Sequence, residues 1–99
     1  MQIIPLQALP NQTVTVNLAD QVCQIDVYTT FYGIFVDLYV NGALLIGGVI
    51  GLNLNKIVRS AYLGFIGDLT FIDQQGTSDP VYTGLGARYV LAYLEASEI

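Results

Sequence analysis

Strict alternation of apolar and other side chains runs through the first half of this 99-residue chain and restricts it to extended structure. The apolar members recur at every second position of residues 12–18 and 22–30: Val14, Val16, Leu18, Cys23, Ile25 and Val27. A period of two places such residues on one face of a strand. The short turn at residues 19–21 should join the two segments. We therefore expect a hairpin of two half-buried strands.

A second hairpin is expected around Asn41-Gly42, because residues 34–40 alternate in the same way and residues 43–50 form a second apolar run. Asn-Gly between two such runs is a strong hairpin signal, since a type I′ turn needs positive φ at both central positions. Gly47-Gly48 interrupts the returning strand. Paired glycines inside a strand indicate a β-bulge or a tight bend.

The remaining segments are shorter. Pro5 and Pro10 favour an extended N-terminal arm over residues 1–11. Residues 51–61 are expected to form a loop with at most one helical turn, residues 62–65 and 69–72 short strands, and residues 87–94 a final strand. About six short strands without an amphipathic helix indicate an all-β fold. We expect one domain over residues 1–99, built as a small antiparallel β-barrel or a compact sandwich.

The charge is low and acidic, and it limits the partners. Three basic and eight acidic residues give a net charge of −5, so nucleic-acid binding through a basic surface is not expected. Residues 38–55 lack charge, but glycines and asparagines interrupt them, so we expect no membrane span. Only 11% of the residues are charged and 54% are hydrophobic, whereas about 25% charge is usual. Protein–protein interfaces, and a homo-oligomer within an assembly, are the expectation.

Catalytic and ligand-binding chemistry is poorly represented. The chain has no histidine, so its serines lack the usual activating base, and we expect no enzyme and no catalytic residues. Asp68, Asp73 and Asp79 fit turn positions better than a carboxylate pair. Residues 73–79 lack the ligand ladder of a calcium loop, and Gly84-Leu85-Gly86 lacks the third glycine of a dinucleotide fingerprint. No metal and no cofactor are therefore expected, and Cys23 is expected to be a buried hydrophobe.

Residues 73–88 form a connection that is long for a hairpin, and its composition indicates order. Tyr82 and Leu85 should pack inward, and Pro80 should restrict the backbone. The glycines should supply positive φ: Gly76, Gly84 and Gly86. An ion pair from Arg88 to Asp73 or Asp79 should tie the loop down.

Seven tyrosines leave two interpretations open. They could pack in the core and anchor protein contacts, or they could stack a ligand on an exposed surface. Without basic neighbours, stacking of nucleic-acid bases is disfavoured. The tyrosines are Tyr28, Tyr32, Tyr39, Tyr62, Tyr82, Tyr89 and Tyr93.

Several motifs together resemble a known family. They are Ile4-Pro5-Leu6, Pro10-Asn11-Gln12, the 37–42 segment Asp-Leu-Tyr-Val-Asn-Gly, the 67–73 segment Gly-Asp-Leu-Thr-Phe-Ile-Asp, and the 82–93 segment that begins Tyr-Thr-Gly-Leu-Gly. In these motifs the chain is similar to the small baseplate plug proteins of contractile-tailed phages and prophages. The similarity covers nearly the whole chain and is most specific over residues 67–93.

The resemblance implies a β-barrel like the oligonucleotide/oligosaccharide-binding (OB) fold and a structural role in the virion. The protein would be assembled in the host cytoplasm, contact other baseplate and tail-hub proteins, and help to close the tail tube at the central hub. A ligand-binding OB-like barrel for oligosaccharide or protein recognition is the alternative. The family signature in the loop gives candidate positions for partner contact: Asp73, Gly76, Asp79, Pro80, Tyr82, Gly84, Gly86 and Arg88.

Overall fold

The computed structural model describes residues 2–59, 65–95 and 97. Within these residues the chain forms seven strands and one short 3-10 helix, as expected for an all-β fold. In chain order they are β1 (Gln2–Ile4), β2 (Asn11–Leu18), β3 (Gln21–Thr30), β4 (Gly33–Val40), β5 (Ala43–Ile50), β6 (Asp68–Asp73), η2 (Tyr82–Gly84) and β7 (Tyr89–Leu94).

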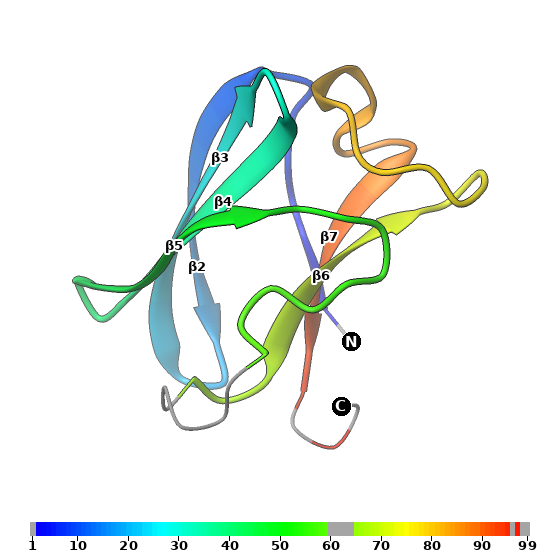
Figure 1. Ribbon diagram of the computed structural model, residues 1–99. Coiled ribbons are helices and arrows are strands. Elements are labelled where there is room, and N and C mark those ends of the chain that lie inside the picture. Colours follow the sequence, from blue (N-terminus) through cyan, green and yellow to red (C-terminus); the bar gives the residue numbers. More distant parts are fainter. Residues whose placement is uncertain (1, 60–64, 96, 98–99) are drawn as a thin grey trace.

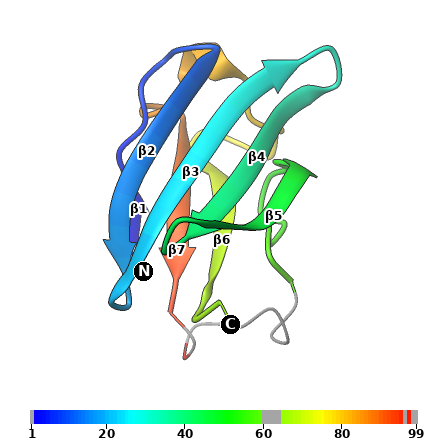
Figure 2. The same cartoon turned by 90° about the vertical axis from the view of Figure 1, so that its left-hand side faces the viewer.

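The strands form two antiparallel sheets that pack face to face (Figures 1 and 2). The larger sheet has the order β2-β3-β4-β5, and the smaller has the order β1-β7-β6. The expected compact sandwich is therefore confirmed.

The closed OB-like barrel is wrong for this chain, since no ladder joins the two sheets in the described residues. After β5 the chain reaches β6 only through isolated bridges, at Asn53 and Lys56. On the other side, β1 has three residues and pairs with β7 rather than with β2. An irregular segment on one side and a very short strand on the other cannot supply the continuous pairing that closes a barrel.

Both predicted hairpins are confirmed. Ala19 and Asp20 connect β2 to β3 with φ values of 51° and 62°, and Asn41 and Gly42 connect β4 to β5 with φ values of 52° and 86°. Positive φ at both central residues is the type I′ geometry, whose twist matches that of the flanking strands.

The predicted bulge is also present, opposite Asp37. Val36 pairs with Val49 but Leu38 pairs with Ile46, so Asp37 faces both Gly47 and Gly48. The Gly48 amide donates to Asp37 Oδ1 at 2.7 Å. This side chain therefore satisfies a donor that the bulge removes from the ladder.

The N-terminal arm differs from expectation, because β1 is part of a sheet. Gln2, Ile3 and Ile4 pair with Tyr93, Ala92 and Leu91 of β7. Ile4 is buried. The predicted extended backbone is confirmed for residues 2–4, which complete the smaller sheet and make β7 the central strand, whereas the chain bends at residues 8 and 10.

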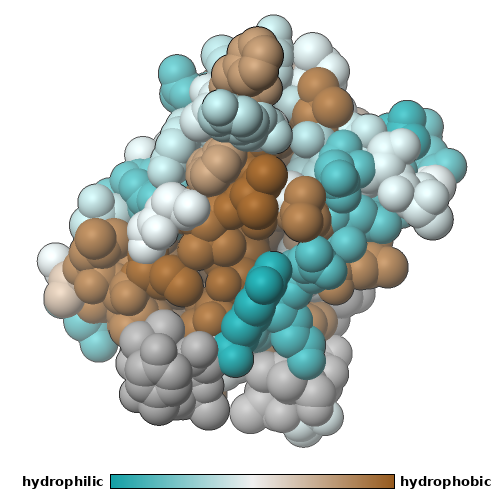
Figure 3. All heavy atoms as spheres, in the orientation of Figure 1, coloured by the Kyte–Doolittle hydropathy of each residue, from teal (hydrophilic) through white to brown (hydrophobic). Residues whose placement is uncertain are grey.

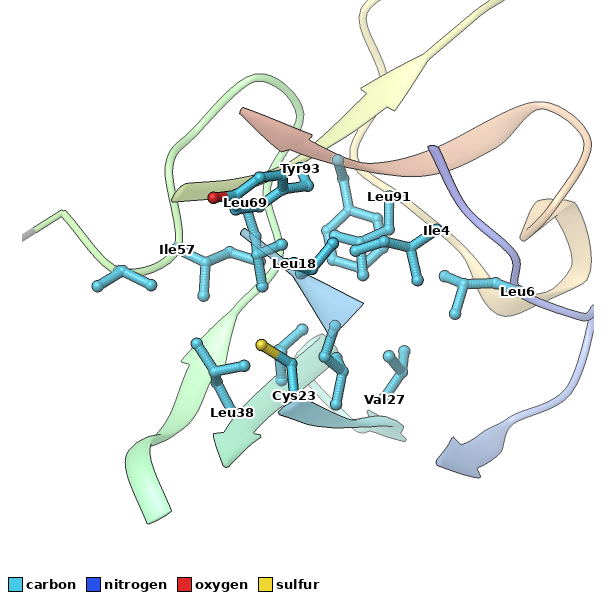
Figure 4. Close-up of a cluster of buried hydrophobic side chains, with 14 of the residues drawn as sticks. Ile4, Leu6, Leu18, Cys23, Val27, Leu38, Ile57, Leu69, Leu91 and Tyr93 are labelled. Carbon is cyan, nitrogen blue, oxygen red and sulfur yellow. The ribbon is translucent and has the colours of Figure 1, made fainter. Parts of the chain in front are cut away.

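The core lies between the sheets and takes one face from each (Figure 4). Cys23 is fully buried as expected, and burial raises the pKa of its thiol. Other buried members of the core are Ile4, Leu18, Val27, Leu38, Ile57, Leu69, Leu91 and Tyr93. Gly51 lies against this core, because a Cβ there would sit 2.5 Å from the ring of Phe71.

The segment after β5 is irregular over residues 51–59, without the helical turn that the sequence allowed. The strand expected over residues 62–65 falls mostly outside the described residues, and Phe65 itself is not in a strand. The strand expected at residues 69–72 is confirmed within β6. Across the described chain, no helix has the length and apolar character needed to cross a membrane.

Candidate functional site

The long connection between β6 and β7 forms a folded loop beside one end of the sandwich (Figure 1). As predicted, it packs apolar groups downward: Leu85 is 3% exposed, Pro80 is buried and Tyr82 is half-buried. The 3-10 helix η2 lies in its second half. The loop is therefore ordered by its own packing, as the composition indicated.

Asp73 fixes the base of this loop. Its side chain has no exposed surface, and it accepts backbone N–H bonds from Gln75 at 2.9 Å and Ser78 at 2.8 Å. Arg88 Nε donates to Asp73 Oδ1 at 2.8 Å, and Nη2 donates to Oδ2 at 2.9 Å. This is the bidentate geometry that guanidinium and carboxylate favour.

The same contacts shift both pKa values. The Arg88 guanidinium and the two amides hold the pKa of Asp73 well below its usual range, against the opposing effect of burial. The Asp73 carboxylate in turn raises the pKa of Arg88. Arg88 also lies over the ring of Tyr89, 5.1 Å from the ring centroid. Of the two carboxylates considered for Arg88, the structure selects Asp73.

Asp79 has a different partner. Its Oδ1 accepts the backbone N–H of Asn53 at 3.0 Å, while Asn53 Oδ1 accepts the N–H of Asp73 at 2.9 Å. Asn53 therefore links the irregular segment after β5 to both ends of residues 73–79. The sequence analysis did not identify Asn53, because no local pattern relates it to a loop 20 residues later.

The glycines of the loop have two different roles. Gly86 has φ +81° as predicted, and a Cβ there would lie 2.2 Å from the Leu6 carbonyl oxygen. Positive φ was wrong for Gly76 and Gly84. Gly84 lies in η2, where a Cβ would approach the Tyr89 ring to 2.7 Å, so close packing rather than backbone conformation explains this glycine.

A second carboxylate, Asp68, organises the segment before β6. This 4% exposed side chain accepts four backbone N–H groups. The donors and distances are Ile57 at 3.1 Å, Val58 at 2.8 Å, Arg59 at 2.8 Å and Leu69 at 2.7 Å. Asp68, Asp73 and Asp79 thus all accept backbone amides. The local turn bond to the residue two positions later is confirmed for Asp73, through Gln75, whereas Asp79 accepts a distant amide and Asp68 mainly accepts distant ones.

The β3–β4 turn carries an exposed aromatic pair that the sequence analysis did not select. Phe31 is 96% exposed and Tyr32 is 79% exposed, and their rings meet edge to face at 5.5 Å. Gly33 takes φ +131°, and Thr30 Oγ1 accepts the Tyr32 amide at 3.1 Å. Two large aromatic residues at a turn that normally favours Gly, Asn or Asp were the available signal.

None of the other tyrosines that the structure describes is largely exposed. Tyr89 and Tyr93 are buried, Tyr28, Tyr39 and Tyr82 are half-buried, and Tyr62 lies outside the described residues. Tyr28 donates to Asp37 Oδ1 at 3.0 Å.

Hydrophobic residues do gather over the face drawn in Figure 3. Within the described residues, no cluster of three metal-ligating His, Cys, Asp or Glu side chains occurs.

The signature residues thus meet in one loop, but they divide by role. Asp73, Pro80, Tyr82, Gly84 and Arg88 build its interior contacts, whereas Gly76, Asp79 and Gly86 lie at its exposed surface. Comparison with known proteins gives one family: the model described as the cyanophage baseplate Pam3 plug gp18 matches residues 1–96. No curated protein matches the chain.

Proposed function

Because the chain belongs to the family of the cyanophage baseplate Pam3 plug gp18, we propose that it is a plug at the central hub of a contractile-tail baseplate and helps to close the tail tube. Membership makes the chain a structural baseplate protein of the virion, in contact with other baseplate proteins. The match over residues 1–96 of 99 is the observation that carries the proposal. Closing the tube, assembly in the host cytoplasm and self-association are the proposed refinements.

The anchoring of the loop supports this role. A component that blocks a tube has to keep its shape while its neighbours are assembled around it. The bidentate Arg88–Asp73 pair ties the two ends of the loop together, and the Asp79–Asn53 bond joins the loop to the segment after β5. Such cross-links favour a fixed surface over a mobile one.

The exposed aromatic turn supports contact with a neighbouring baseplate protein. Large aromatic residues commonly supply much of the binding free energy at protein interfaces. Phe31 and Tyr32 stand at the end of a ten-residue and an eight-residue strand, so a regular ladder holds the turn. We assign the turn, together with the exposed residues of the loop, as contact positions in the baseplate.

A ligand-binding barrel is not favoured by any specific observation. The sandwich is not closed, and among the described tyrosines Tyr82, Tyr89 and Tyr93 pack with the core while only Tyr32 is largely exposed. Asp68 and Asp73, which could otherwise hydrogen-bond a polar ligand, are already engaged with backbone amides.

Deletion of the gene in the phage or prophage that encodes this chain tests the proposal. We expect tails with an open tube at the tip, seen by electron microscopy, and restoration when the wild-type gene is supplied. A second complementation uses the Phe31→Ser/Tyr32→Ser variant, which should fold but occupy the tip poorly. Tails that lack the protein yet have a closed tube would contradict the tube-closing role.

A further inference from the structure

Among the described residues, one sheet edge has no covering segment, whereas the other three edges are covered, interrupted or very short. The β6 edge is covered by the preceding segment, through Leu54 N to Phe71 O at 2.8 Å and Ile57 N to Leu69 O at 2.9 Å. The β5 edge is broken by register shifts, and β1 has only three residues. The remaining edge is β2, which is eight residues long and regular.

The outward groups of β2 follow from its pairing. Pro10 O accepts the Thr29 amide at 2.8 Å, so this position belongs to the hydrogen-bonded class of the β2–β3 ladder. In an antiparallel ladder the class alternates, so even-numbered residues of β2 bond to β3 and odd-numbered residues direct N–H and C=O away from it. The outward residues are Asn11, Thr13, Thr15 and Asn17. No described hydrogen bond uses their backbone groups beyond β3.

The usual devices that prevent edge pairing are missing from β2. The strand contains no charged residue, no proline and no bulge. Its inward side chains include Val14 and Val16, which are only half-buried although they pack against the core. Another strand beside β2 would satisfy the outward groups and cover these two valines.

We propose that the β2 edge pairs antiparallel with the β2 edge of a second copy of this chain. One register uses every outward group: Asn11 opposite Asn17 and Thr13 opposite Thr15 of the second copy. Val14 then faces its own counterpart on the inner side. The two larger sheets would join into one continuous sheet across a two-fold axis, as expected for an isologous contact.

A second copy can approach this edge at a lower electrostatic cost than it can approach a charged surface. Two chains of net charge −5 repel, and an uncharged strand is where their approach costs least. Asp26 is the nearest carboxylate on β3, across from Thr13. In the proposed pairing, the two copies of Asp26 are separated by three strand spacings, about 14 Å, beyond the Debye length of about 8 Å at physiological salt.

Sedimentation equilibrium of the purified full-length protein, from micromolar to near-millimolar concentration, tests the proposal. We expect a monomer–dimer equilibrium. Thr15→Lys should raise the dimer dissociation constant about tenfold or more, because it places a cation at the edge of each copy. Gln24→Lys is the matched control. Gln24 pairs with Thr15 in the ladder and is exposed, but it lies one strand inside the edge, so this variant should still dimerise.

Amide hydrogen exchange distinguishes this dimer from one formed through another surface. The N–H groups of Thr13, Thr15 and Asn17 should exchange more slowly as concentration rises. A wild-type protein that stays monomeric at near-millimolar concentration would overturn the proposal. Equal dimerisation of both lysine variants, or a dimer without protection at these amides, would do the same. None of these outcomes depends on the role in the tail, which the gene deletion tests separately.

Discussion

Arg88 and Asp73 form a bidentate ion pair across the base of the β6–β7 loop, with Nε to Oδ1 at 2.8 Å and Nη2 to Oδ2 at 2.9 Å. The carboxylate side chain has no exposed surface, while the Arg88 side chain is 36% exposed. The first residue of the loop is thereby bound to one of its last. Removing either group should loosen the whole loop rather than one contact.

Acid should destabilise the protein through Asp73. Its pKa is lower in the folded state than the unfolded value of about 3.9, so its stabilising contribution is complete above about pH 4 and is lost as pH falls further. We expect the free energy of unfolding of the wild type to decrease below about pH 4. Arg88→Ala should be less stable near neutral pH and should show a shallower decrease.

Urea unfolding at a series of pH values on both sides of pH 4 measures this difference. Arg59→Ala is the control, because the Arg59 side chain is exposed and donates to the Lys56 carbonyl instead. Parallel pH profiles for the wild type and Arg88→Ala would refute the role of the ion pair.

Gly86→Ala should destabilise the fold more than Gly42→Ala. Both glycines have positive φ, +81° and +86°, so alanine at either should cost roughly 1–2 kcal/mol in backbone conformation. A Cβ at position 86 would also lie 2.2 Å from the Leu6 carbonyl oxygen, whereas position 42 has open space. The urea midpoints of the two variants measure the extra cost. Equal midpoints would mean that the N-terminal segment around Leu6 moves away from the added methyl group without a measurable cost in stability.

Asp68→Asn should lower the free energy of unfolding by about 1–3 kcal/mol, the cost of leaving a buried donor unpaired. The carboxylate accepts four amides through two oxygens. Asparagine keeps one acceptor oxygen, but its NH₂ group cannot accept the amide that was bonded to the oxygen it replaces. Asp20→Asn, at an exposed turn residue with φ 62°, should change stability by less than about 0.5 kcal/mol. Similar losses in both variants would show that the amide contacts contribute little.

Phe31→Ser/Tyr32→Ser should leave stability within about 0.5 kcal/mol, because both side chains are largely in solvent. We expect the same variant to lose affinity for baseplate proteins, measured by co-sedimentation with tails assembled without the plug. Leu9→Ser removes another exposed apolar side chain, 44% exposed, from a segment outside the strands, and should retain binding. If the Phe31→Ser/Tyr32→Ser variant binds the tails as tightly as the wild type does, the turn is not part of the interface.

Local chemistry by itself determined the two hairpins. Alternation across residues 12–40 sets which side chains face inward, and Asn41-Gly42 can adopt positive φ without a Cβ penalty at the glycine. The bulge at Gly47-Gly48 follows in the same way from residues close in sequence. Because charged residues are scarce in this part of the chain, the sequence alone limited the expected partner of Arg88 to Asp73 or Asp79.

Tertiary structure decided the features that depend on residues far apart in the chain. Whether the strands close a barrel depends on where β1 and the segment after β5 find partners, and no period in the sequence encodes that choice. Gly86 owes its identity partly to the Leu6 carbonyl at the other end of the chain. Asp68 acts on amides about ten residues earlier. Such contacts form only when the packed chain brings distant groups together, so physical fit rather than local preference selected these residues.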